Sequence, residues 1–163
     1  MKKINYTLLL FCLAIGFTAC KKNLGIENFD VDGQFRRDTT AIRAFAVANN
    51  IPIVKDPTYN IFYQIIKPGE GPDIEIKPLS NLSVTYTGRL LNGKAFDTQT
   101  TPTDFFPLSG MITGWEVGIP ILKKKGGKIR LLLPSVYGYG NLPYGPIPAN
   151  SVLDFDVEIV DVK

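Results

Sequence analysis

The stretch VTYTGRLLNGKAFDTQ, residues 84–99, decides the fold of this chain. Apolar and polar residues alternate through residues 82–91, which is typical of a strand with one buried face. The dipeptide Asn92-Gly93 follows, and it is a strong signal for the two-residue turn of a β-hairpin. Such a turn predicts that Leu91 pairs with Lys94 and that two antiparallel strands extend from there.

The predicted turn also fixes which residues of the hairpin face each other. In the same register Gly88 pairs with Asp97, and Tyr86 pairs with Gln99. Because residues two positions apart lie on one face of a strand, Tyr86 and Asp97 become diagonal neighbours. Phe96 falls on the opposite face in this register. The hairpin is therefore expected to place a tyrosine beside an aspartate.

The rest of the chain predicts further short strands and one short helix. Residues 61–66, 127–133 and 151–162 are rich in apolar, β-branched and aromatic residues, and they predict three more strands. Residues 114–122 are the one short helical candidate among these strands, and Pro120 interrupts them. Several antiparallel strands combined with one short helix indicate an α+β fold.

The N-terminus is interpreted as a processing signal that does not belong to the fold. Lys2 and Lys3 precede an apolar run at residues 6–17, and small residues then precede Cys20. This layout resembles a bacterial lipoprotein signal, in which residues 1–19 are removed and Cys20 carries the lipid. An ordinary cleaved signal or an uncleaved anchor is the alternative. We expect a lipid-anchored protein of the bacterial cell envelope, either facing the periplasm or on the outer membrane.

Two further segments are predicted between this signal and the strands. Residues 20–37 are polar and mixed, and we interpret them as a tether. Asp38 is a favourable helix cap, and the apolar spacing after it predicts a helix within an extension at residues 38–55. Residues 28–33 superficially match the start of a calcium loop, but we interpret them as a turn. The main domain then covers residues 56–163.

Composition excludes several classes of function. The chain has 18 Lys or Arg against 15 Asp or Glu, and two of the lysines lie in the predicted signal. The remaining charge is close to neutral, so we expect no nucleic-acid partner. The absence of histidine excludes Ser–His and Cys–His hydrolases and His-ligated zinc enzymes. We expect no metal and no cofactor. Cys12 lies in the predicted signal and Cys20 is the predicted lipid site, so no disulfide is expected.

Short motifs along residues 56–163 give the chain a specific resemblance. They are YTG at 86–88, NG at 92–93, AFD at 95–97, MITGWE at 111–116, YGYG at 137–140 and FDVE at 155–158. Together they resemble the FKBP-type peptidyl-prolyl cis/trans isomerases, in a lipoprotein form from a Gram-negative bacterium. The resemblance implies a curved antiparallel β-sheet wrapped over one short α-helix, with the ligand bound between them.

The resemblance also implies a pocket for a proline ring and assigns roles within it. Catalytic roles fall to Tyr86, Asp97 and Tyr139. Since the residue that matches Phe96 also lines the pocket in the family, the strand is expected to bulge near Asp97. The loop at residues 141–150 overhangs the site in the family. The residues expected to bind substrate are Phe96, Phe106, Met111, Ile112, Trp115, Ile147 and Phe155.

One segment departs from the family pattern. Residues 102–107 usually carry two aromatic residues two positions apart, whereas here Phe105 and Phe106 are adjacent and Asp104 precedes them. We assign the pocket role to Phe106. The changed rim favours an alternative function, in which the same fold serves as a non-catalytic peptide-binding chaperone or adaptor module in the envelope.

The favoured interpretation is an enzyme that accelerates the rotation of X–Pro bonds during the folding of envelope proteins. Rotation about an amide makes and breaks no covalent bond, so catalysis needs only preferential binding of the twisted amide. A pocket of aromatic rings without a nucleophile suits that reaction. The expected partners are proline-containing polypeptides and, through the lipid on Cys20, the membrane. We expect a monomer.

Overall fold

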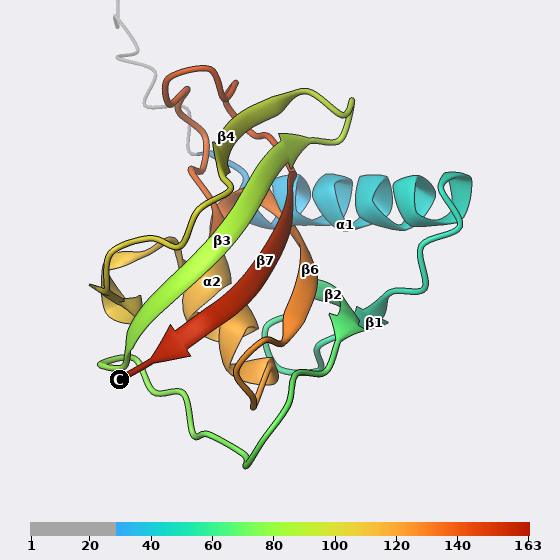
Figure 1. The fold of residues 1–163 in the computed structure, drawn as a ribbon. Helices are drawn as coiled ribbons and strands as arrows, with labels where there is room; N and C mark the ends of the chain where they lie inside the picture. The colour runs from blue at the N-terminus through green and yellow to red at the C-terminus, as the bar shows by residue number, and fades with distance from the viewer. Residues whose placement is uncertain (1–28) are drawn as a thin grey trace, which may run out of the picture.

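The computed structural model describes residues 29–163, and an antiparallel sheet is their framework. Its strands hydrogen-bond in the order β1-β2-β6-β7-β3-β4, and β5 pairs with β3 off this path (Figure 1). The predicted α+β class with an antiparallel sheet is confirmed. The strands are β1 (Val54–Lys55), β2 (Phe62–Lys67), β3 (Asn81–Leu90), β4 (Ala95–Gln99), β5 (Phe106–Pro107), β6 (Lys128–Leu133) and β7 (Leu153–Val162).

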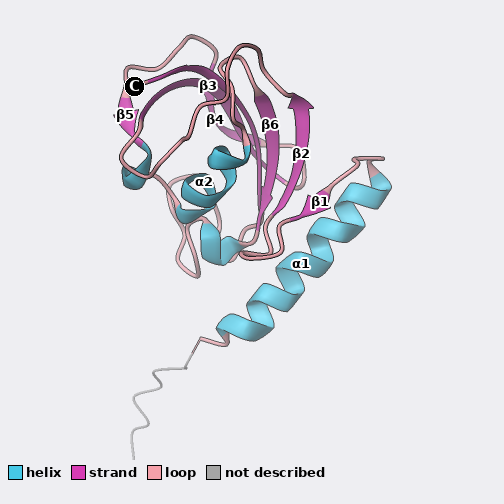
Figure 2. Cartoon of the chain, turned by 90° about the horizontal axis from the view of Figure 1, so that it is seen from below, coloured by secondary structure: helices cyan, strands magenta, loops and turns pink. Residues whose placement is uncertain are grey.

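The sheet curves around α2 (Thr113–Gly118), which continues directly into the 3-10 turn η3 (Ile119–Ile121). In Figure 2 the strands arch over α2, and the long helix α1 lies outside the sheet. A glycine lets α2 approach the strands closely, because a Cβ on Gly118 would lie 2.7 Å from a methyl carbon of Leu131. The helix predicted over residues 114–122 is confirmed as this pair of short helical segments.

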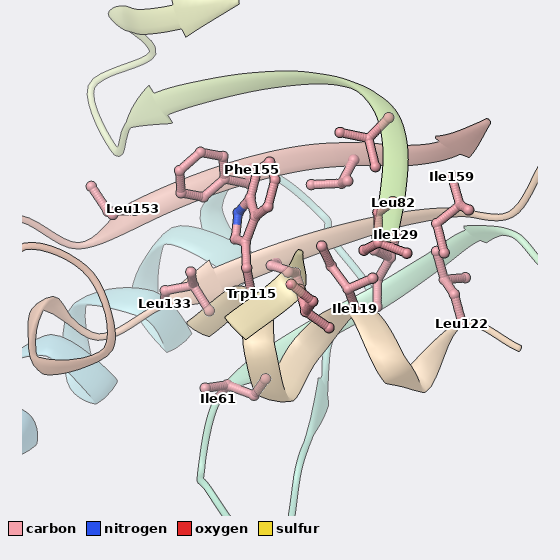
Figure 3. Packing of buried hydrophobic residues seen from close by; sticks show 14 of the residues in the cluster. Ile61, Leu82, Trp115, Ile119, Leu122, Ile129, Leu133, Leu153, Phe155 and Ile159 are labelled. Atoms are coloured by element: carbon pink, nitrogen blue, oxygen red, sulfur yellow. The ribbon is translucent and has the colours of Figure 1, made fainter. Parts of the chain in front are cut away.

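The main core fills the space between α2 and the concave face of the sheet. Ile129, Leu131 and Leu133 of β6 are fully buried there, at the alternate positions that face one side of a strand. Figure 3 shows side chains of the sheet and of the α2 region converging on this space, with Trp115 next to Phe155. The core is therefore continuous with the floor of the cavity described below.

The helix α1 (Val31–Ala48) forms a second, smaller core. Ile42 is fully buried in a cluster with Phe62, Leu132 and Val152. Leu132 lies between two residues of β6 that face the main core, and it points the other way because successive strand residues alternate. At this position β6 is therefore covered on both faces.

The start of α1 corrects three predictions. The helix begins at Val31, so the prediction of a tether as far as Arg37 and a cap at Asp38 is wrong. The cap is Asp30, whose carboxylate accepts a hydrogen bond from the N–H of Gly33 at 2.8 Å. The predicted turn around the calcium-like motif is wrong too, because Gly33 already lies in the helix. The first helical turns contain few apolar residues, so apolar spacing alone did not reveal them.

The β3–β4 hairpin confirms the register predicted away from the turn. Gly88 pairs with Asp97 as expected, but the next pair is Arg89 with Ala95. The pairing shifts by one residue between them, so Phe96 is the extra residue of a bulge. The bulge predicted near Asp97 is therefore confirmed.

The turn of this hairpin is one residue longer than predicted. The N–H of Leu90 donates to the carbonyl of Lys94 at 3.0 Å, which leaves three residues in the loop. Gly93 has a φ of 83°, the left-handed conformation that closes three-residue loops and that glycine adopts without strain. The predicted pairing of Leu91 with Lys94 is wrong. The longer loop and the bulge offset each other, which restores the expected register further along.

The predictions for the N-terminus lie outside the described residues. The signal at residues 1–19 and the lipid site Cys20 both precede residue 29, where the description begins. Within residues 29–163, no helix combines the length and the apolar character that crossing a membrane requires. The signal and the lipid site stay predictions.

Candidate functional site

A cavity of about 330 Å³ opens between the β3–β4 hairpin, the start of α2 and the loop that follows β6. Trp115 and Phe155, which pack next to each other in the main core (Figure 3), form part of its lining. Eight of the ten residues assigned to the pocket from the sequence line it. The lining residues are Tyr86, Phe96, Asp97, Gly110, Met111, Ile112, Trp115, Tyr139, Tyr144 and Phe155.

Trp115 forms the inner wall of the cavity. It lies in the first turn of α2, and its side chain is almost fully buried. Its ring meets Tyr86 edge-to-face at a centroid distance of 5.1 Å and meets Phe155 in the same way at 5.4 Å. Its Nε1 is buried without a hydrogen-bond partner among the described residues. The indole is therefore packed against aromatic rings on two sides.

A second aromatic pair forms the adjoining wall. Phe96 meets Phe155 edge-to-face at a centroid distance of 5.4 Å and an interplanar angle of 85°. Gly88 lies beneath both rings, because a Cβ placed there would come within 2.6 Å of ring atoms of each. The bulge turns Phe96 toward this face, and the missing side chain at Gly88 makes room for it.

A hydrogen bond between Tyr86 and Asp97 forms the polar edge of the cavity. The hydroxyl of Tyr86 donates to Oδ2 of Asp97 at 2.6 Å across the hairpin. Burial raises the pKa of Tyr86 well above its usual range, and the hydrogen bond and charge of Asp97 raise it further. Tyr86 is therefore neutral at physiological pH, and its ring is held in a fixed orientation beside Trp115.

Two tyrosines from the loop after β6 form the opposite edge. Tyr139 stacks on Tyr144 with ring centroids 4.5 Å apart and an interplanar angle of 10°. Burial raises the pKa of Tyr139, and Tyr144 and Asp97 add smaller effects in the same direction. The hydroxyl of Tyr139 therefore keeps its proton and remains a hydrogen-bond donor at the cavity.

Tyr144 is a lining residue that the sequence prediction missed, whereas Ile147 was assigned to the pocket and does not line it. The two residues exchange backbone hydrogen bonds of 2.9 Å in both directions, which closes a tight turn between them. Ile147 is 3% exposed and belongs to the main core, while Tyr144 faces the cavity. The sequence signal for Tyr144 was that it is the aromatic residue of the Pro/Gly-rich segment 141–150, which was expected to overhang the site.

Phe106 is the other assigned residue that does not line the cavity. Its ring centroid lies 6.3 Å from that of Trp115, and the side chain packs against the main core. Phe105 beside it is exposed, with the ammonium of Lys163 3.8 Å from its ring centroid. The choice of Phe106 over Phe105 selects the inward-facing ring, which supports Trp115 from outside the cavity.

The chemistry available at this site comes from aromatic rings, three tyrosine hydroxyls and one carboxylate. Within residues 29–163, no group of three or more His, Cys, Asp or Glu side chains is placed to hold a metal ion. Met111 at the rim is 37% exposed and adds a flexible apolar surface. The arrangement suits an apolar ring held among aromatic walls, with hydrogen bonds to polar groups at its edges.

Comparisons with known proteins point to one family. The model for "FKBP-type peptidyl-prolyl cis-trans isomerase" matches residues 73–160. FkpA of Escherichia coli K12, named an FKBP-type peptidyl-prolyl cis-trans isomerase, is 40% identical over 112 residues, which cover 68% of this chain and 40% of the relative. This chain therefore spans less than half the length of that curated relative.

Two solved structures share the fold. The crystal structure of FkpA from Escherichia coli superposes with a TM-score of 0.67 at 34% identity, covering 80% of this chain and 60% of that one. A peptidyl-prolyl cis-trans isomerase from Pseudomonas syringae pv. tomato superposes with a TM-score of 0.64 at 30% identity, covering 78% of this chain and 95% of that one.

The family match spans the elements that build the cavity. Residues 73–160 include the β3–β4 hairpin, α2 and the loop after β6, and they make up more than half of the chain. The fold comparisons place the same curved sheet and short helix in proteins of this family. This chain belongs to the FKBP-type peptidyl-prolyl cis-trans isomerase family.

Proposed function

We propose that this protein is a peptidyl-prolyl cis/trans isomerase that accelerates rotation about X–Pro bonds in folding polypeptides. The observation that carries the proposal is the cavity around Trp115. Aromatic rings form two of its sides, and Tyr86, Asp97 and Tyr139 supply polar groups at its edges. Family membership supports the same activity.

The reaction requires a site that favours the twisted amide over the planar one. The barrier to rotation is about 18–20 kcal/mol, because rotation removes the double-bond character of the C–N bond. The planar amide is the more charge-separated form, so apolar aromatic walls disfavour it relative to the twisted form. Lowering the barrier by about 5–6 kcal/mol would accelerate rotation on the order of 10⁴-fold.

The aromatic walls and the polar edges of the cavity have different roles in the proposed reaction. The proline ring rests against Trp115, and Phe96 and Phe155 form the adjoining wall. The protonated hydroxyl of Tyr139 donates to a substrate carbonyl and holds the chain on one side of the twist. Asp97 fixes the ring of Tyr86 through the 2.6 Å hydrogen bond, which keeps the wall in place during rotation.

A proline-limited refolding assay, together with cis/trans kinetics on a proline peptide, tests the activity. We expect Tyr139→Phe to lower kcat/KM about ten-fold, because it removes one neutral hydrogen-bond donor and keeps the ring. Trp115→Ala removes the inner wall, so its rate should approach the uncatalysed rate. Asp104→Asn is the control and should keep the wild-type kcat/KM, since Asp104 is exposed and does not line the cavity. A wild-type protein that leaves the slow refolding phase unchanged would refute the proposal.

A binding module without catalysis is the competing outcome of this experiment. The same cavity could hold a proline peptide without lowering the barrier to rotation. Trp115 forms a wall of the cavity, so its fluorescence is the probe of peptide binding in either outcome. Quenching by a proline peptide without acceleration of refolding would identify a chaperone or adaptor and exclude the enzyme.

We further propose that the protein is a monomeric lipoprotein of the cell envelope, anchored through Cys20 and acting on proline-containing envelope proteins. The support is the sequence pattern at residues 1–20: two lysines, an apolar run and small residues before the cysteine. Labelled palmitate should enter the wild-type protein and not Cys20→Ser in growing cells. A label that persists in Cys20→Ser would refute the anchor, and sedimentation of the fragment that begins at Lys21 tests the monomer.

A further inference from the structure

A buried acid on α1 has no part in the proposed reaction. Asp38 lies in the middle of the helix and is only 3% exposed. Its Oδ2 accepts hydrogen bonds from the backbone N–H of Ser135 at 2.8 Å and from the Ser135 hydroxyl at 2.6 Å. Its Oδ1 accepts from Nε2 of Gln34 at 2.6 Å. Burying a carboxylate is unfavourable unless such donors satisfy it, and here three donors converge on one side chain.

Ser135 connects this carboxylate to the cavity. It begins the 3-10 turn η4 (Ser135–Tyr137), which follows β6. Its carbonyl accepts hydrogen bonds from the N–H of Gly138 at 3.0 Å and from the N–H of Gly140 at 2.9 Å. These glycines flank Tyr139, which lines the cavity. The backbone on both sides of Tyr139 is therefore bound to a residue that Asp38 holds.

Other contacts hold α1 against the same turn. The ring of Phe35 meets that of Tyr137 edge-to-face, with centroids 6.1 Å apart. The guanidinium of Arg37 donates twice to Oε1 of Gln34, at 2.9 and 3.2 Å, which directs the amide of Gln34 toward Asp38. These contacts lie on the first half of the helix, next to η4.

We propose that Asp38 is a positioning residue of the isomerase site: it holds the turn that carries Tyr139, and α1 thereby contributes to activity. The inference rests on the proposed function, in which the hydroxyl of Tyr139 binds a substrate carbonyl. Asp38 does not line the cavity and acts only through Ser135. Without its carboxylate the turn loses its anchor, and a displacement of about 1 Å at a site can cost on the order of 100-fold in rate.

Kinetics on the full chain test this role against a purely structural one. Asp38→Asn keeps the shape of the side chain but cannot accept all three hydrogen bonds, and Ser135→Ala removes only the hydroxyl bond. We expect kcat/KM to fall about ten-fold in Asp38→Asn and less in Ser135→Ala, with kcat falling more than KM rises. Asp32→Asn, on an exposed position of the same helix, is the matched control and should match the wild type.

A double-mutant cycle separates positioning from stability. If Asp38 acts through Tyr139, then Asp38→Asn should have little further effect on kcat/KM once Tyr139→Phe has removed the hydroxyl. Additive losses would overturn the inference. So would an Asp38→Asn variant that melts at a lower temperature but keeps wild-type kcat/KM under conditions where both proteins are folded.

Hydrogen exchange tests the inference independently of activity. The amides of Gly138 and Gly140 should exchange on the order of ten-fold faster in Asp38→Asn, because their acceptor Ser135 loses its anchor. Unchanged exchange at these amides would refute the role of Asp38, even in an active enzyme. An inactive wild-type protein whose amides respond as expected would refute the proposed function alone.

Discussion

Gly88 is a position where a single added methyl group should disturb the cavity around Trp115 directly. It lies on β3 opposite Asp97, beneath the rings of Phe96 and Phe155. An added Cβ would lie 2.6 Å from Cε1 of Phe155 and 2.6 Å from both Cε2 and Cζ of Phe96. Gly88 does not have a positive φ, so Gly88→Ala introduces crowding and no backbone strain.

The magnitude of the effect follows from these distances. Carbon atoms pack best at about 3.5–4.0 Å, so each ring must withdraw by on the order of 1 Å from the position it now holds. Overpacking of a close-packed core typically destabilises a protein by about 1–3 kcal/mol. Because both rings line the cavity, we also expect kcat/KM to fall by roughly 10–100-fold.

Denaturation in urea and cis/trans kinetics on a proline peptide measure the two effects together. Gly93→Ala is the matched control, because a Cβ at Gly93 meets nothing within 4 Å while its φ of 83° is left-handed. That substitution should cost about 1–2 kcal/mol through backbone strain and leave the cavity and kcat/KM unchanged. The two variants thus separate stability from cavity shape.

The result that would refute the reasoning is Gly88→Ala with wild-type kcat/KM. It would mean that the rings of Phe96 and Phe155 yield without changing the site, or that they do not contact the substrate. A further check is Gly88→Ala combined with Phe96→Leu, which shortens one of the crowded side chains. This combination should recover part of the stability lost in Gly88→Ala, and no recovery would place the strain elsewhere.

Two further predictions follow from charge and burial. The fold raises the pKa values of Tyr86 and Tyr139, so kcat/KM should stay flat from about pH 6 to about pH 9. The stability that these neutral tyrosines contribute should be lost only as the pH rises above about 10. A midpoint in kcat/KM below pH 9 would contradict this prediction. Arg130 donates to both carboxylate oxygens of Asp154, at 2.8 and 2.6 Å, and Asp154 is 2% exposed. Arg130→Met should therefore lower the free energy of unfolding in urea by about 3–5 kcal/mol. Lys124→Met breaks only the surface pair with Asp73 and should cost less than about 1 kcal/mol. Equal losses in these two variants would contradict the burial argument.

The sheet and most of the cavity wall could be predicted from the sequence because they depend on local order along the chain. Alternation in each strand decides which side chains face inward, and the hairpin pairs Gly88 with Asp97 through residues close in sequence. The bulge at Phe96 was expected from the family pattern. The length of the turn was not, because a three-residue loop with a left-handed Gly93 and a bulge gives the same register as a two-residue loop.

The sequence by itself determined the α+β framework and which aromatic residues lie along it, since periodicity is a property of neighbouring residues. Only the tertiary structure decided that Tyr144 faces the cavity while Ile147 enters the core, because one tight turn separates them. The tertiary structure also buries Asp38, which was expected to cap a helix, and its carboxylate holds Ser135, 97 positions away. A polar side chain can be buried only where donors meet it, and those donors come together only when the chain has folded.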